Sequence, residues 1–200
     1  LMSQWIITPD KFLTDEESKR LRKICEEVAI IAKSKGNQIA IRDRLIIEIA
    51  LGTGLRVSEM ANLKVEDIYF RKGQNSLTVR DGKGSKDRVV AFNNRLKSLI
   101  QEYLDYRISK SPYLFYSERG EKMGRFGISK VFKKVAREAD LSTHHSIHTL
   151  RHTYATNLYK ASDYNLRLVQ KQLGHSSITT TTVYSDVLSK DLEDAVENLE

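Results

Sequence analysis

The chain has 200 residues, 40% hydrophobic and 30% charged, so it is long enough for one compact domain and too well mixed for long disorder. It has no apolar run that could span a bilayer and no signal peptide, and its lone Cys25 excludes an internal disulfide and a cysteine-based zinc site. We therefore expect a soluble cytoplasmic protein. Its net charge of +7 favours a polyanionic partner, although ordinary surface charge explains that value equally well.

The first part of the chain has helical periodicity. Thr14 followed three residues later by Glu17 predicts a capping box that opens a helix running to about residue 34. A second helix is predicted over residues 39–51, where the glycines at 52 and 54 end it, and a short helix is predicted over 57–63.

The middle of the chain changes to strand periodicity. Residues 76–80 and 88–92 predict two strands of a β-hairpin, joined by a polar, glycine-bearing connection, and 112–117 are a candidate for one more short strand. Further helices are predicted over 94–108, 128–139, 148–160 and 165–173. We therefore expect one domain over 1–200, mainly α with a small antiparallel β-sheet (α+β), with a lead-in at 1–13 and a tail helix at 185–200.

Four of the five histidines lie within residues 144–152. On a helix that begins near His148, Leu150, Tyr154 and Leu158 form an apolar stripe, while His148, Arg151 and His152 fall on the neighbouring arc. Such an arc suits a phosphate group, because arginine forks onto two oxygens and histidine donates or shuttles a proton. Two alternatives are a histidine metal site and ordinary structural histidines.

Two other patches carry candidate functional residues. Arg56 and Glu59 are three residues apart at the start of a predicted helix, where Glu59 could orient the Arg56 guanidinium; the alternative is a plain surface ion pair. Gly174 suits the end of a helix, and Tyr184 follows His175 by nine residues. A tyrosine at such a place is usually a half-buried packing residue.

Taken together, these patches resemble the tyrosine recombinase family, which includes phage integrases, chromosome-dimer resolvases and fimbrial inversion recombinases. The resemblance runs from about Thr14 to the C-terminus. In chain order, the matching segments are the arginine box 54–59, the hairpin with Lys83, Lys86 and Arg88, the His-x-x-Arg-His box 148–152, the Leu-Gly-His box 173–175 and Tyr184. Each motif alone is weak, but all of them in this order are very specific.

The resemblance implies covalent catalysis on DNA. Tyr184 would attack a phosphodiester, form a 3′-phosphotyrosyl link and free a 5′-hydroxyl, without metal or ATP. Arg56 and Arg151 would neutralise the charge that develops on the phosphate, and His175 would donate a further hydrogen bond. Tyrosine has an ordinary pKa near 10 and needs activation, for which His148 is the candidate base.

The remaining roles are also implied by the resemblance. Lys83 is the candidate acid for the departing 5′-oxygen, with Lys86 as an alternative. Glu59 and His152 would orient the other groups, and Lys86 and Arg88 are candidate DNA contacts. The expected partners are double-stranded DNA and other copies of the chain, in a tetramer on DNA formed from a monomer or weak oligomer, with no membrane.

Several features depart from that pattern or leave alternatives open. The N-terminal core-binding domain of most family members is expected to be absent. Residues 178–183 are almost wholly β-branched, which by propensity favours a strand, whereas the resemblance implies a short helix carrying Tyr184. The amphipathic tail could pack on its own core or on a neighbouring subunit. Alternative functions are a type IB topoisomerase, a non-catalytic DNA-binding regulator and a metal-dependent hydrolase.

Overall fold

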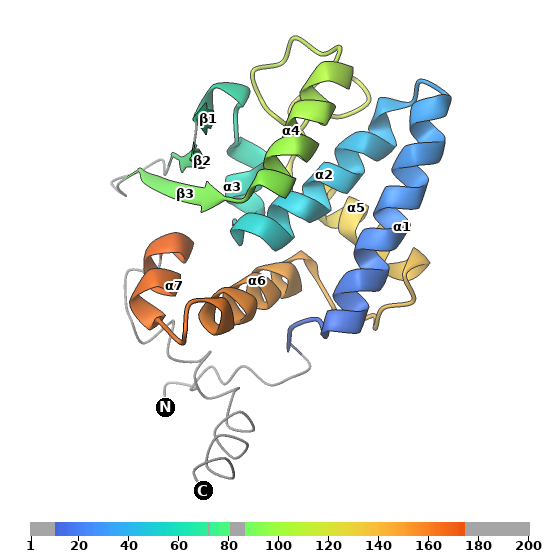
Figure 1. The fold of residues 1–200 in the computed structure, drawn as a ribbon. Coiled ribbons are helices and arrows are strands. Elements are labelled where there is room, and N and C mark those ends of the chain that lie inside the picture. The colour runs from blue at the N-terminus through green and yellow to red at the C-terminus, as the bar shows by residue number, and fades with distance from the viewer. Residues whose placement is uncertain (1–10, 72, 81–86, 175–200) are drawn as a thin grey trace, which may run out of the picture.

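The computed structural model describes residues 11–71, 73–80 and 87–174 (Figure 1). In this part of the chain there are seven α-helices, and a three-stranded sheet lies at one side of them. In chain order the elements are α1 (Asp15–Ser34), α2 (Gln38–Thr53), α3 (Val57–Asn62), β1 (Ile68–Arg71), β2 (Gln74–Val79), β3 (Arg88–Phe92), α4 (Asn94–Tyr106), α5 (Arg125–Glu138), α6 (Ile147–Ala161) and α7 (Leu166–Leu173). The predicted class, mainly α with a small antiparallel sheet, is confirmed.

All the helices predicted within the described residues are present, with bounds that differ by up to three residues, and the predicted tail helix lies outside these residues. The capping box of α1 is complete: the Glu17 amide donates to Thr14 Oγ1 at 3.2 Å, and the Thr14 amide donates to Glu17 Oε2 at 2.8 Å. Helix α2 is longer than predicted because its ends are well capped. The Asn37 side chain accepts from the Ile39 amide, and Gly54 closes the helix in the left-handed conformation with φ of +63°.

The sheet has the order β1-β2-β3, and both neighbouring pairs are antiparallel. The predicted hairpin of β2 and β3 is confirmed. Strand β1 was not predicted: it is only four residues long and its burial merely alternates between half-buried and exposed. It joins the sheet through its register with β2, in which Ile68 pairs with Leu77.

The predicted strand over 112–117 was wrong, because this segment makes only isolated bridges, Lys64 with Tyr113 and Tyr116 with Lys122. The reason is that its backbone groups find other partners. The Arg107 guanidinium donates to the carbonyl oxygens of Ser109, Ser111 and Tyr113. The segment is therefore a loop whose carbonyl groups are satisfied by an arginine side chain.

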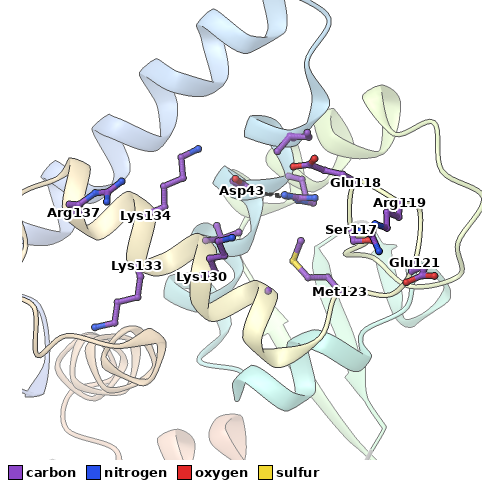
Figure 2. A pocket seen from close by; sticks show the side chains of 14 residues that line it. Asp43, Ser117, Glu118, Arg119, Glu121, Met123, Lys130, Lys133, Lys134 and Arg137 are labelled. Atoms are coloured by element: carbon purple, nitrogen blue, oxygen red, sulfur yellow. Dashed lines mark hydrogen bonds and ion pairs between the residues drawn. The ribbon is translucent and has the colours of Figure 1, made fainter.

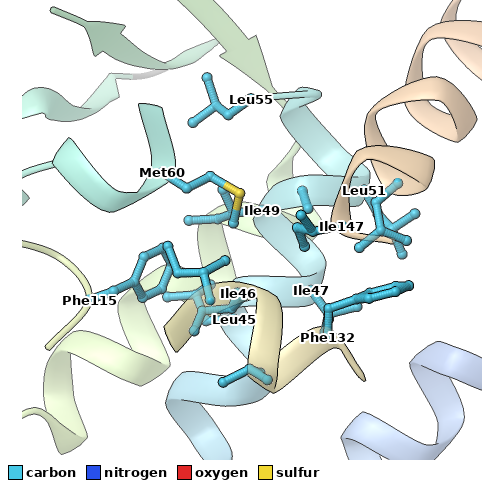
Figure 3. Close-up of a cluster of buried hydrophobic side chains, with 14 of the residues drawn as sticks. Leu45, Ile46, Ile47, Ile49, Leu51, Leu55, Met60, Phe115, Phe132 and Ile147 are labelled. Carbon is cyan, nitrogen blue, oxygen red and sulfur yellow. The ribbon is translucent and has the colours of Figure 1, made fainter. Parts of the chain in front are cut away.

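Helix α2 forms the centre of the hydrophobic core. It is largely apolar around its whole circumference, and α1, α4, α5 and α6 pack against it. Figure 3 shows Leu45, Ile46, Ile47 and Ile49 from this helix lying among Met60, Phe115, Phe132 and Ile147 from other elements. Because the helix is enclosed, its C-terminal end at Thr53–Gly54 lies at a fixed place in the fold.

A buried carboxylate ties three helices together. Glu48 on α2 accepts two hydrogen bonds from the Arg95 guanidinium of α4, at 2.6 and 2.7 Å, and Arg22 of α1 approaches it at 3.3 Å. A carboxylate in this position is tolerated only because it is paired and hydrogen-bonded. The interaction therefore fixes how α1 and α4 lie on α2.

Helix α6 joins the main core to a smaller apolar cluster. Of the predicted stripe, Leu150 lies in the main core, while Tyr154 and Leu158 are half-buried beside the cluster that α6 forms with α7. The Leu13 amide donates to Thr153 Oγ1 at 2.8 Å, which attaches the segment before α1 to α6. None of the described helices combines the length and the apolar character needed to cross a membrane.

The central role of α2 predicts a position-dependent loss of stability. Ile46 is fully buried, whereas Ile30 on α1 is 60% exposed. Ile46→Ala should lower the free energy of unfolding by about 3 kcal/mol, because it leaves a cavity in the core. Ile30→Ala is the matched control and should change it by less than about 0.5 kcal/mol. Urea denaturation of both variants checks this, and equal losses would contradict the central position of α2.

Candidate active site

The loop between α2 and α3 positions the first pair of predicted site residues. Arg56 is the N-cap of α3, and its amide donates to Glu59 Oε2 at 2.8 Å while its Nη1 donates to Glu59 Oε1 at 2.9 Å. The Glu59 side chain is only 6% exposed, whereas 41% of the Arg56 side chain is exposed. This pair is therefore a buried carboxylate that holds an accessible guanidinium, and not a surface ion pair.

A second arginine, Arg88, binds the carboxylate of Glu59. Arg88, the first residue of β3, donates from Nη1 to Glu59 Oε1 at 2.8 Å and from Nη2 to Glu59 Oε2 at 2.9 Å. Its side chain is 14% exposed. This two-point contact is the strongest geometry available to an arginine and a carboxylate. The placement of Arg88 favours a role inside the site over the predicted contact with DNA.

Arg151 on α6 also contacts the α2–α3 loop. It is buried, and its guanidinium donates to the carbonyl oxygen of Gly54 and, at 3.0 Å, to that of Leu173. The first contact holds the loop that leads to Arg56. The second satisfies a carbonyl group at the C-terminal end of α7, where a cation is favourable. Arg151 therefore links α6, the α2–α3 loop and the end of α7.

These residues form one electrostatic unit. Burial alone would raise the pKa of the Glu59 carboxyl, but the hydrogen bonds from Arg88 and the Arg56 amide, together with the charges of Arg88 and Arg151, hold it below its ordinary value. Glu59 is therefore ionised at neutral pH. Three guanidinium groups face a single carboxylate, so the cluster keeps a net positive charge, as a site for a phosphodiester requires.

The two histidines of the predicted arc lie on α6 beside Arg151. His148 is exposed in the first turn of the helix, and His152 is half-buried one turn later. Burial, together with the positive charges of Arg151, His148 and Lys11, lowers the pKa of His152 to about 4. His152 is therefore uncharged at neutral pH, which suits a hydrogen-bonding residue better than a phosphate-binding cation.

Lys83, Lys86, His175 and Tyr184 lie outside the described residues, as do the segment 178–183 and the predicted tail helix. Two described residues that lie close to them in the sequence, Arg88 and Gly174, are in contact with each other. Gly174, which precedes His175, has φ of +67°, and a Cβ atom there would lie 2.6 Å from Arg88 Nε. Glycine is favoured at this position, because the left-handed backbone would strain another residue and a Cβ atom would force the Arg88 side chain to move.

Among residues 11–71, 73–80 and 87–174, no group of three or more His, Cys, Asp or Glu side chains could hold a metal ion. A cavity of about 860 Å³ lies elsewhere, between α2, the loop 117–123 and α5 (Figure 2). Lys130, Lys134 and Arg137 line it together with Asp43 and Glu118. None of the predicted site residues that the structure describes borders it, so it is separate from the arginine cluster.

Known proteins are similar to this chain in both sequence and structure. Residues 11–190 match the phage integrase family. Tyrosine recombinase XerA of Pyrococcus furiosus is 42% identical over 193 residues, which are 95% of this chain and 62% of that protein. This chain spans 60–62% of the length of three XerA relatives.

Two crystal structures have the same fold. The XerH site-specific recombinase in a post-cleavage complex with its palindromic difH substrate has a TM-score of 0.79 and 29% identity, covering 94% of this chain and 52% of that chain. The XerA recombinase has a TM-score of 0.75 and 29% identity, covering 92% of this chain and 63% of that chain.

The burial of His152 predicts a specific dependence of stability on pH. Its folded-state pKa of about 4 lies below the ordinary 6.5, so the unfolded chain binds one more proton between these values. Stability should therefore fall as the pH drops from 6.5 towards 4, with a contribution of at most about 1.4 kcal/mol per pH unit.

Denaturation at several pH values checks this against His152→Gln, in which this contribution should be missing while the other acid-sensitive groups remain. NMR titration of His152 gives the pKa directly. A midpoint near 6.5 would show that the imidazole is not buried in solution.

Proposed function

Since the chain belongs to the phage integrase family, we propose that it cuts and rejoins DNA as a tyrosine-type site-specific recombinase. The observation that carries the proposal is the arginine cluster, in which Arg56, Glu59, Arg88 and Arg151 meet beside Gly174. Because the chain spans less than two thirds of its XerA relatives, the activity of the whole protein is part of the proposal.

The reaction we propose is a reversible transesterification. Tyr184 Oη attacks the phosphorus atom, a bond forms between them, and the bond from phosphorus to the 5′-oxygen breaks. The tyrosine loses its proton and the departing 5′-oxygen gains one. Because the 3′-phosphotyrosyl link retains the energy of the phosphodiester, a 5′-hydroxyl of another strand can attack it and restore the DNA backbone without ATP.

The arginines supply the charge that this reaction needs. Negative charge accumulates on the non-bridging oxygens in the transition state, and preorganised cations stabilise it most when they need not move. Arg56 has the accessible side chain for direct contact with a phosphate, and Glu59 holds it in place. Arg151 is buried behind the loop, where it adds positive charge and fixes the backbone of Gly54 and Leu173.

The proton transfers are assigned to residues that the family resemblance indicates. His148, exposed in the first turn of α6, is the proposed base for Tyr184, and the N-terminal end of that helix favours an anion nearby. Lys83 is the proposed acid for the 5′-oxygen, with Lys86 as the alternative, and His175 is a proposed hydrogen-bond donor to the phosphate. Uncharged His152 and ionised Glu59 orient their neighbours.

The proposed partners are duplex DNA and further copies of the chain. The net charge of +7 supports binding to DNA through its phosphates. The XerH structure of similar fold is described as bound to its DNA substrate after cleavage, which supports the same kind of partner here. Exchange of two duplexes requires four strand cuts, so we propose a four-subunit assembly on DNA.

The nucleophile assignment predicts the outcome of one substitution. A duplex nicked near the scissile phosphate traps the covalent product, because the short leaving strand diffuses away. The wild-type chain should form a protein–DNA adduct that survives denaturation, and Tyr184→Phe should form none, since it lacks the attacking oxygen. Denaturing gel electrophoresis with labelled DNA checks this. An adduct with Tyr184→Phe would refute the assignment, and loss of the adduct with chelator would refute metal-free chemistry.

Strand exchange should follow cleavage. With two labelled duplexes that carry the same target site, the wild-type chain should produce recombinant strands, because the 5′-hydroxyl of either duplex can attack the phosphotyrosyl link. Sequencing of the products checks this. Plasmid relaxation without recombinant strands would instead identify a topoisomerase-like activity.

A further inference from the structure

Arg88 lies at the end of the β2–β3 hairpin that adjoins the connection between the two strands. It is the first residue of β3 and pairs with Val79, the last residue of β2. In the sequence, Lys83 and Lys86 lie between these two strands. Any contact that holds Arg88 in place therefore also fixes the start of β3, directly after the connection that contains the candidate acids Lys83 and Lys86.

The guanidinium of Arg88 is committed to Glu59. Both terminal nitrogens donate to the two carboxylate oxygens, and only 14% of the side chain is exposed. Glu59 in turn holds Arg56 through the backbone amide and through Nη1. The contacts thus form a chain from β3 through a buried carboxylate to the accessible arginine of the α2–α3 loop.

Arg88 also packs against the end of α7. Helix α7 lies beside β3 (Figure 1), and the Gln172 side chain donates to the Ala91 carbonyl oxygen at 2.6 Å. The absence of a side chain at Gly174 leaves the space that Arg88 Cδ and Nε occupy. Arg88 therefore belongs to the strand that follows Lys83 and Lys86 in the sequence, and it contacts two other parts of the chain, Glu59 near Arg56 and Gly174 next to His175.

The other strand of the hairpin offers a matched contrast. Arg80, which follows β2, donates from Nε to the buried carboxylate of Asp67 at 2.6 Å. Both sides of the hairpin thus end in an arginine held by a buried acid. Asp67, however, binds the Lys64 amide and does not contact the arginine cluster.

Building on the proposed function, we propose that Arg88 is a positioning residue for DNA cleavage, which acts through Glu59 on Arg56 and does not itself contact DNA. Without Arg88, Glu59 keeps its burial but loses its two-point partner, and Arg56 becomes the main partner of both oxygens. The Arg56 guanidinium would then be drawn towards Glu59 and away from the phosphate. A displacement of this kind slows cleavage more than it weakens DNA binding.

The test uses the full chain, a nicked duplex, and Arg88→Ala, Arg88→Lys and the control Arg80→Ala. Adduct formation is followed in single turnover, and DNA affinity is measured separately over a range of salt concentrations. Arg88→Ala should slow adduct formation about 100-fold. Arg88→Lys keeps the positive charge but loses the two-point contact with Glu59, and it should slow adduct formation about tenfold. Arg80→Ala should stay close to wild type, because it removes a contact between an arginine and a buried carboxylate that lies outside the cluster.

Salt dependence separates positioning from contact with DNA. An arginine that contacts a phosphate contributes about one unit to the slope of log affinity against log salt. The slope should be unchanged in Arg88→Ala. A slope reduced by that amount, a loss of affinity as large as the loss of rate, or an equal loss of rate in Arg80→Ala would overturn the proposal.

The pH profile tests whether Arg88 acts through Glu59. Glu59 faces Arg56 on its own helix cap, Arg88 from β3 and Arg151 from α6. In Arg88→Ala the burial remains but the largest stabilising hydrogen bond is lost, so the pKa of Glu59 should rise. Cleavage should then fail at a higher pH than in the wild type as the medium is acidified, and Glu59→Gln should abolish this difference. If Arg88→Ala does not fold, Arg88→Lys gives the same comparison.

A titration of the Glu59 carboxyl carbon by NMR in the free protein does not depend on cleavage. If the wild-type chain forms no adduct, the proposed function fails, while an upward shift of the Glu59 pKa in the Arg88 variant still supports the contact chain. An unchanged Glu59 pKa overturns the positioning role even if cleavage by the wild type is normal.

Discussion

The enclosure of α2 is the constraint on which the rest of the structure depends. Four other helices cover it, so its direction and its end cannot vary independently of the core. Gly54 ends it in a left-handed conformation, closely packed against side chains of α6 and α7. The loop that follows therefore leaves the core at one defined place. Arg56 and Glu59 belong to this loop and the first turn of α3, so core packing sets the position of these candidate site residues.

The candidate active site is assembled from secondary-structure ends rather than from one element. Glu59 lies in the first turn of α3, Arg88 begins β3, and Arg151 lies in the first part of α6. Leu173 ends α7, and Gly174 is its C-cap. Helix and strand ends bring backbone groups and side chains together without a deep cavity. A phosphodiester of duplex DNA lies on the surface of the duplex. An open site of this kind suits it better than the separate cavity between α2, the loop 117–123 and α5 does.

The buried negative charge of Glu59 is compensated by the groups that contact it. An unpaired carboxylate at the position of Glu59 would be costly, and two arginines and a backbone amide compensate for it by direct hydrogen bonds. Because Arg56 and Arg88 both bind this carboxylate, its negative charge offsets the repulsion between the two guanidinium groups. Neutral His152 beside Arg151 avoids adding a further cation to an already positive cluster. The result is a positively charged site whose arginines are held in place by contacts within the protein.

The sequence by itself determined the helices, the β2–β3 hairpin and the family, because periodicity, capping residues and ordered motifs are local properties of the chain. It also indicated the Arg56–Glu59 pair, since three residues separate them on one helix turn. It did not reveal β1, which depends on pairing with β2, or that 112–117 is a loop held by Arg107. Only the tertiary structure decided that Arg88 faces Glu59 rather than solvent and that Arg151 binds Gly54 and Leu173, because these contacts join residues far apart in the sequence and depend on burial.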